Sequence, residues 1–132
     1  MDQYNPKVIA VSKTFKEQDI LPLLDYGHCH FGENKVQEAL LKWPNLKEKY
    51  KKVKLHMLGK LQTNKAKFAV EIFDYIHSLD NLKLANKLAN EIHKKNKKVK
   101  MFIQINLGGE KQKSGIDPNN LETFYKSCLS LK

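Results

Sequence analysis

Arginine is absent from this chain, although its 24 lysines outnumber its 14 acidic residues and give a formal net charge of +10. Specific readout of bases and bidentate binding of phosphates usually depend on the flat guanidinium fork, which lysine cannot reproduce. We therefore expect no specific binding of nucleic acid. The lysines are densest in residues 47–54 and 94–100, which we expect to be solvated helix ends and loops. Non-specific binding of nucleic acid through these lysines is an alternative function.

Cysteine is scarce, and long apolar runs are missing. Cys29 and Cys128 are the only cysteines and form no C-x-x-C pair, so the sequence predicts reduced thiols and neither a disulfide scaffold nor a zinc ribbon. No apolar run comes near the roughly 18 to 20 residues that a membrane helix needs, and the first residues, MDQYNPK, lack the pattern of a signal peptide. We therefore expect a cytoplasmic protein without a membrane span.

Short apolar runs alternate with helical patterns along the 132 residues, which suit one domain better than two. One helical stripe begins at Val36 and should end at Pro44, and the last begins after Asp117 and Pro118. Alternating strands and helices predict the α/β class, with a parallel sheet that is either doubly wound or part of a (β/α)8 barrel. A complete barrel takes about 250 residues, so the five βα units that fit here would make a partial barrel. The five runs lie at 8–11, 28–31, 53–58, 74–78 and 99–105.

Lys13 is the candidate with the clearest chemistry, because functional side chains in parallel α/β folds gather where strands end. It directly follows the apolar run at 8–11, so we expect its amine to be carried into a partly desolvated site, where the nucleophilic neutral form is favoured. Such a lysine can form a Schiff base with an aldehyde. A lysine that simply reaches from the strand end into water is the alternative.

Other motifs carry weaker signals. Lys113 and Ser114 follow a strand in a glycine-containing segment, but Gln112 stands where a P-loop needs glycine. His28 and His30 share one face of a strand, and without further ligands at suitable spacing we expect core or surface histidines and no metal site. Gln104 and Asn106 make one face polar at the end of the fifth run, where they either face a ligand or cap a layer of the barrel.

Four segments, taken together, resemble the motifs of the pyridoxal phosphate homeostasis protein family in order and spacing. These proteins are single-domain barrels that bind pyridoxal 5'-phosphate (PLP) and are related to the N-terminal domain of alanine racemase. The resemblance implies a partial barrel that binds PLP, buffers it and delivers it to PLP-dependent apoenzymes. The segments are VIAVSKT at 8–14, FGENKVQE at 31–38, HMLGKLQTNK at 56–65 and IQINLGGEKQKSG at 103–115.

The resemblance also implies the residues of the site. Lys13 would hold PLP as a Schiff base, and Lys113 would serve as a second amine for capture or transfer. Beside the cofactor ring it places Asn34, His56, Met57 and Gly59, and near the mouth of the pocket Lys113, Ser114 and Gly115. No catalytic residue is assigned. A racemase-like PLP enzyme is an alternative, and it would need a second acid or base that we cannot assign.

The chain also departs from the family pattern. Relative to that pattern, we expect residues 1–132 to form one incomplete barrel domain, which lacks the N-terminal helix and the last three βα units. Those units carry the family's phosphate-binding residues and the arginine that faces the pyridine nitrogen. The exposed edges of a partial sheet predict either a monomer or self-association.

Overall fold

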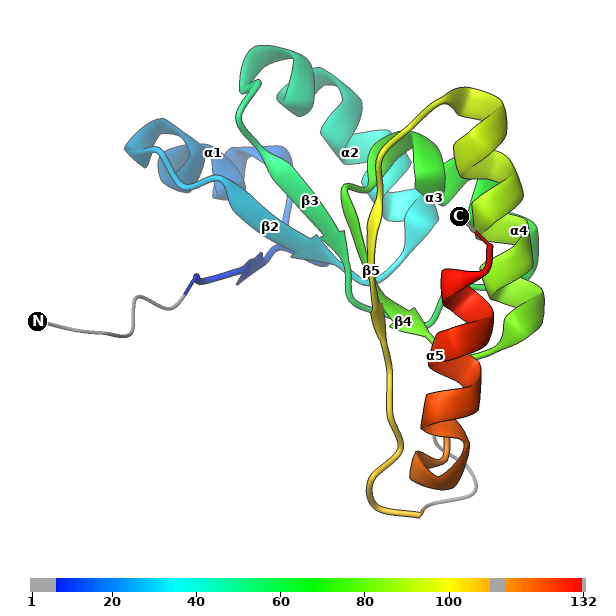
Figure 1. Ribbon diagram of the computed structural model, residues 1–132. Helices are drawn as coiled ribbons and strands as arrows, with labels where there is room; N and C mark the ends of the chain where they lie inside the picture. Colours follow the sequence, from blue (N-terminus) through cyan, green and yellow to red (C-terminus); the bar gives the residue numbers. More distant parts are fainter. Residues whose placement is uncertain (1–6, 110–113, 132) are drawn as a thin grey trace, which may run out of the picture.

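A parallel sheet of five strands, in the order β1-β2-β3-β4-β5, forms the centre of the computed structural model, which describes residues 7–109 and 114–131 (Figure 1). A doubly wound sheet would reverse its strand order at a switch point, whereas this order follows the sequence throughout, as in a barrel. The predicted α/β class and partial barrel are therefore confirmed. The elements are β1 (Ala10–Val11), α1 (Glu17–Tyr26), β2 (His30–Glu33), α2 (Val36–Lys49), β3 (Lys54–Met57), α3 (Ala66–Ile72), β4 (Tyr75–Leu79), α4 (Leu82–Lys95), β5 (Lys100–Ile103) and α5 (Leu121–Leu129), with short 3-10 turns at Thr63–Lys65 and Pro118–Asn120.

The two faces of the sheet differ in burial. Alternate strand residues such as Phe31, Leu55 and Ile76 are fully buried beneath the helices, which cover one face of the sheet (Figure 1). On the opposite face, Val11 and Phe102 each keep 49% of their surface exposed. The core therefore lies between sheet and helices, and the face that would line a closed barrel is open among the described residues.

Helix α2 corrects a prediction, because it continues through Pro44 to Lys49. Proline removes one backbone hydrogen bond from the helix, but Trp43 and Leu46 on either side of it are buried against the core. The apolar stripe thus continues past the proline, and its burial outweighs the lost bond.

The strand boundaries also differ from those predicted. The second strand is His30–Glu33, two residues later than the run at 28–31. Strand β1 shrinks to Ala10–Val11, because it lies at the edge of the sheet and has only β2 as a neighbour. The Asp117 side chain accepts a hydrogen bond from the backbone N–H of Asn119 and so caps the 3-10 turn Pro118–Asn120, which leads into α5 at Leu121.

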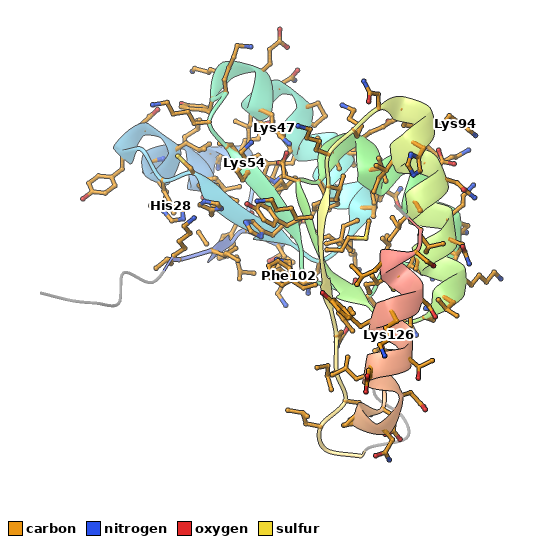
Figure 2. The ribbon with its side chains drawn as sticks, in the orientation of Figure 1. His28, Lys47, Lys54, Lys94, Phe102 and Lys126 are labelled. Carbon is orange, nitrogen blue, oxygen red and sulfur yellow. The ribbon has the colours of Figure 1, made fainter. Side chains whose placement is uncertain are left out.

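The lysine-rich segments lie mostly in turns and helix ends, as predicted. Lys54 and Lys94 are exposed, and Figure 2 shows them with Lys47 toward the end of the molecule where β3 and β5 begin. Lys47 and Lys95 are exceptions, because both are half-buried: the Lys47 ammonium pairs with the Asp74 carboxylate at 2.8 Å, and the Lys95 ammonium pairs with the Glu71 carboxylate at 2.9 Å. Within residues 7–109 and 114–131, no helix has both the length and the hydropathy needed to cross a membrane.

Candidate functional site

Lys13 lies in a tight turn that leaves the carboxyl end of β1. The backbone N–H of Phe15 donates to the Ser12 carbonyl at 3.2 Å and closes the turn. Thr14, the next residue, has a φ of 66°, a left-handed conformation that is unfavourable for a β-branched side chain. The Lys13 side chain is exposed, which corrects the prediction of a partly desolvated amine. The reason is its place after an edge strand, where only β2 lies beside it.

Asn34 and Gly59 follow the next two strands and touch each other. Val11 pairs with Gly32, and Glu33 pairs with Met57, so the ends of β1, β2 and β3 come side by side. A Cβ atom added to Gly59 would lie 2.4 Å from the Asn34 carbonyl oxygen, so only glycine allows this approach. The carboxyl ends of these three strands therefore place Lys13, Asn34 and Gly59 at the same end of the sheet, as the sequence predicted.

Two cavities flank this edge of the sheet and share Lys60. The larger, of about 540 Å³, includes Asn34 and Met57 among its lining residues. The smaller, of about 390 Å³, is lined partly by Gln104 and Ser114. Sequence reasoning did not single out Lys60, although it lies within the segment HMLGKLQTNK.

His56 lies on the open face of β3 in a row of three histidines. Its Nε2 atom is 3.0 Å from His30 Nδ1, and its Nδ1 atom is 2.8 Å from His77 Nε2. The Tyr75 ring stacks on it with 4.2 Å between ring centroids, and the side chain is only 4% exposed. Both ring nitrogens of His56 are therefore occupied by other imidazoles, so it stabilises the sheet face and has no free nitrogen for a ligand.

The pKa values of all three imidazoles are lowered, which favours their neutral forms. Burial, and then the nearby His77 and His30, lower the pKa of His56 from its ordinary 6.5 to about 4. Burial also lowers the pKa of His30 and of His77. A neutral imidazole has one donor and one acceptor nitrogen, which is what each link of the row requires. This row was not predicted, although aligning the strand residues 30, 56 and 77 on one sheet face would have revealed it.

Ser114 and Gly115 return to the same edge of the sheet beside β5. The backbone N–H of Ile116 donates to the Gln104 carbonyl at 2.7 Å, and that of Gly115 donates to Asp80 Oδ2 at 3.0 Å. Gly115 has a φ of 120°, which favours glycine. Lys113 lies outside the described residues. Lys13, Asn34, Gly59, Ser114 and Gly115 therefore all lie at the carboxyl end of the sheet, but Lys13 follows the edge strand β1 whereas Ser114 and Gly115 lie beside the opposite edge strand β5. Met57 is buried under the helices, and His56 lies on the open face.

The arrangement offers an exposed primary amine at the carboxyl end of the sheet, on the strand next to the close contact between Asn34 and Gly59. Lys13 makes no ion pair or hydrogen bond with another described residue, so its amine is available to react. No group of three His, Cys, Asp or Glu side chains in the described segments is suited to a metal ion. The exposed amine of Lys13 can react with an electrophile such as an aldehyde.

The amino-acid sequence matches the family described as alanine racemase, N-terminal domain, over residues 1–132. A pyridoxal phosphate homeostasis protein of Pasteurella multocida is 38% identical over 125 residues, which cover 95% of this chain and 54% of the relative. One from Aquifex aeolicus is 36% identical, with the same coverage of both chains. The chain thus spans about half the length of the curated relatives it matches.

Solved structures give the same picture. PipY of Synechococcus elongatus without PLP has a TM-score of 0.89 and 39% identity, covering 98% of this chain and 61% of that one. PipY with PLP bound has a TM-score of 0.87 and 37% identity, covering 98% and 60%. An alanine racemase of Clostridium difficile shares the fold, with a TM-score of 0.76 and 13% identity. The match covers 100% of this chain and 34% of the racemase chain.

Proposed function

Because the chain belongs to the alanine racemase N-terminal domain family, we propose that it binds PLP through Lys13 and holds the cofactor for delivery to other proteins. The observation that carries this proposal is the exposed Lys13 amine at the carboxyl edge of the sheet, next to the contact between Asn34 and Gly59. The similarity to PLP homeostasis proteins and to PipY with PLP bound supports the choice of cofactor.

The residues present fit such a cofactor. PLP supplies an aldehyde that condenses reversibly with a primary amine, releasing water without any change in oxidation state. Lys13 provides the amine, and the close contact of Gly59 with the Asn34 backbone, which a side chain at position 59 would prevent, holds the ends of β2 and β3 together beside it. Ser114 lines the smaller cavity together with Lys60, and the backbone N–H of the next residue, Gly115, is held by Asp80. Lys113 is part of this proposal as a second amine.

His56 and Met57 have supporting roles in this proposal. His56 fixes the open face through His30 and His77, and Met57 fills the core behind the larger cavity. A carrier needs no residue that moves a proton on a substrate, so binding and release of the cofactor suffice. We further propose that the recipients are PLP-dependent apoenzymes and that the protein is cytoplasmic, where the free thiols of Cys29 and Cys128 suit a reducing compartment.

Trapping the cofactor on the protein tests the proposal. PLP is added to the chain, the carbon–nitrogen double bond is reduced with borohydride, and the label is located by peptide mass mapping. We expect label at Lys13 near one equivalent, and its loss in Lys13→Ala. Lys126→Ala is the matched control, because Lys126 is an exposed lysine on α5 (Figure 2). Label spread over many lysines and unchanged in Lys13→Ala would contradict the proposal.

A further inference from the structure

The buried ammonium of Lys42 links helix α2 to the turn that carries Lys13. Lys42 is only 7% exposed, and its Nζ atom donates to the Ser12 carbonyl at 2.8 Å and to the Phe15 carbonyl at 2.7 Å. These two carbonyls belong to the first and last residues of the turn. Lys42 therefore fixes the backbone on both sides of Lys13.

Two carboxylates hold Lys42 and the turn together. Glu33, which is fully buried at the end of β2, lies 2.8 Å from Lys42 Nζ and also accepts from the Ser12 hydroxyl at 2.6 Å. Glu38 lies 3.2 Å from the same ammonium and accepts from the backbone N–H of Thr14 at 2.5 Å. Each carboxylate thus binds both Lys42 and the turn, so the charged group and the backbone form one network.

The backbone of this turn needs such support. Thr14 adopts a left-handed conformation that is costly for a β-branched residue and persists only where surrounding contacts over-determine it. The bonds from Lys42 and to Glu38 restrain three of the four residues of the turn directly. Without the ammonium, the Ser12 and Phe15 carbonyls would lose a buried donor, and the turn would relax toward other conformations.

We infer that Lys42 is a positioning residue for Lys13: its ammonium, held by Glu33 and Glu38, fixes the strained turn so that the Lys13 side chain leaves the backbone in one direction at the carboxyl end of the sheet. The inference rests on the proposed function, since Lys13 is the amine that reacts. Lys42 itself touches no reacting atom. A fixed backbone at residue 13 leaves the Lys13 side chain less conformational freedom to lose when its amine reacts, and this raises the rate of the reaction.

The test compares Lys42→Met with Lys47→Met in the full chain. Lys47 is a matched control, because it also lies on α2 and its ammonium also binds a carbonyl, that of Ile72, and a carboxylate, that of Asp74. Each variant is treated with PLP and borohydride, and the rate of labelling at Lys13 is measured relative to that at the exposed Lys126 on α5. Amide hydrogen exchange of Thr14 and Phe15 and the free energy of unfolding are measured in parallel.

We expect labelling of Lys13 in Lys42→Met to slow about tenfold, which is about 1.4 kcal/mol of lost pre-organisation, while labelling of Lys126 is unaffected. Exchange at Thr14 and Phe15 should also become faster. Lys47→Met should lose stability without either change. Equal labelling of Lys13 in the two variants would overturn the inference.

A second variant covers the case in which Lys42→Met does not fold because Glu33 is left buried without its cation. The double variant Glu33→Gln/Lys42→Met removes both charges at nearly constant volume. This variant should fold, and PLP should label its Lys13 about tenfold more slowly than that of the parent chain. Labelling at the rate of the parent chain would refute the role of Lys42. If the parent chain shows no preference for Lys13, the proposed function fails. Unchanged exchange at Thr14 and Phe15 in Lys42→Met would then reject the positioning role separately.

Discussion

The row of three histidines on the open face predicts that lowering the pH destabilises the protein. We expect this loss to begin at pH values above those at which carboxylates become protonated. The central residue, His56, is buried and bonded on both sides to neutral imidazoles. Protonating it in the folded state would place a charge in a poorly solvated position and break one of the two bonds. In the unfolded chain the protonated imidazole is solvated and no such bond is lost, so protonation favours unfolding.

The expected magnitude follows from the pKa of His56. Folding lowers this pKa from 6.5 to about 4, so the unfolded chain binds the proton more tightly than the folded chain does. The stabilisation is therefore complete above the unfolded value of 6.5 and is lost as the pH falls toward 4. The full loss is about 3 kcal/mol, of which about 2 kcal/mol falls between pH 7 and pH 5. His30 and His77, whose pKa values are also lowered, change stability in the same direction.

Urea unfolding at a series of pH values tests this prediction. Trp43 is the single tryptophan and is fully buried, so its fluorescence reports unfolding. His56→Gln keeps a donor and an acceptor but cannot titrate in this range. Between pH 7 and pH 5, the free energy of unfolding should fall in both proteins, and the fall in His56→Gln should be smaller than that in the parent chain by about 2 kcal/mol.

A control separates His56 from histidines in general. His93→Gln is the matched control, because it makes the same replacement at an exposed histidine at the end of α4, outside the row. If His56→Gln and the parent chain lost the same stability between pH 7 and pH 5, the argument from the buried row of histidines would be refuted.

Two further substitutions probe the edge of the sheet. Gly59→Ala should lower the free energy of unfolding by about 1 to 3 kcal/mol, because the new Cβ would lie 2.4 Å from the Asn34 carbonyl oxygen; an unchanged urea midpoint would show that the two loops separate freely. Thr14→Asn should raise the free energy of unfolding by up to about 1 kcal/mol, because asparagine tolerates a φ of 66° better than threonine. A urea midpoint below that of the parent chain would show that the Thr14 side chain stabilises the turn.

The existence of the five βα units was predictable because each depends on local periodicity. The boundaries were less predictable, and α2 shows why. Pro44 signals a helix end when residues are considered singly, but the buried stripe through Trp43 and Leu46 depends on the core that the helix packs against. The spatial order of the strands was open for a related reason. Doubly wound sheets and barrels share the same alternation along the chain, and only long-range pairing distinguishes them.

The position of Lys13 was predictable, but its environment was not. The rule that functional groups follow parallel strands places Lys13, Asn34 and Gly59 at one edge, and the structure agrees. The exposure of Lys13 depends on what lies across the sheet from it, and no local pattern records that. The row of histidines was missed for the same reason, since His30, His56 and His77 come from three different strands.

Lys42 shows most clearly how a charged residue can be required in a core. From the sequence, Glu38 and Lys42 form an ordinary pair at positions i and i+4 of a helix, a pattern typical of exposed faces. The fold turns this pair inward, where the Ser12 and Phe15 carbonyls need donors and the buried Glu33 needs a cation. An apolar side chain at position 42 would satisfy neither need, and an arginine would have to fit a larger planar group where the ammonium now lies. The backbone carbonyls of the turn therefore explain why position 42 is a lysine. The same turn carries Lys13.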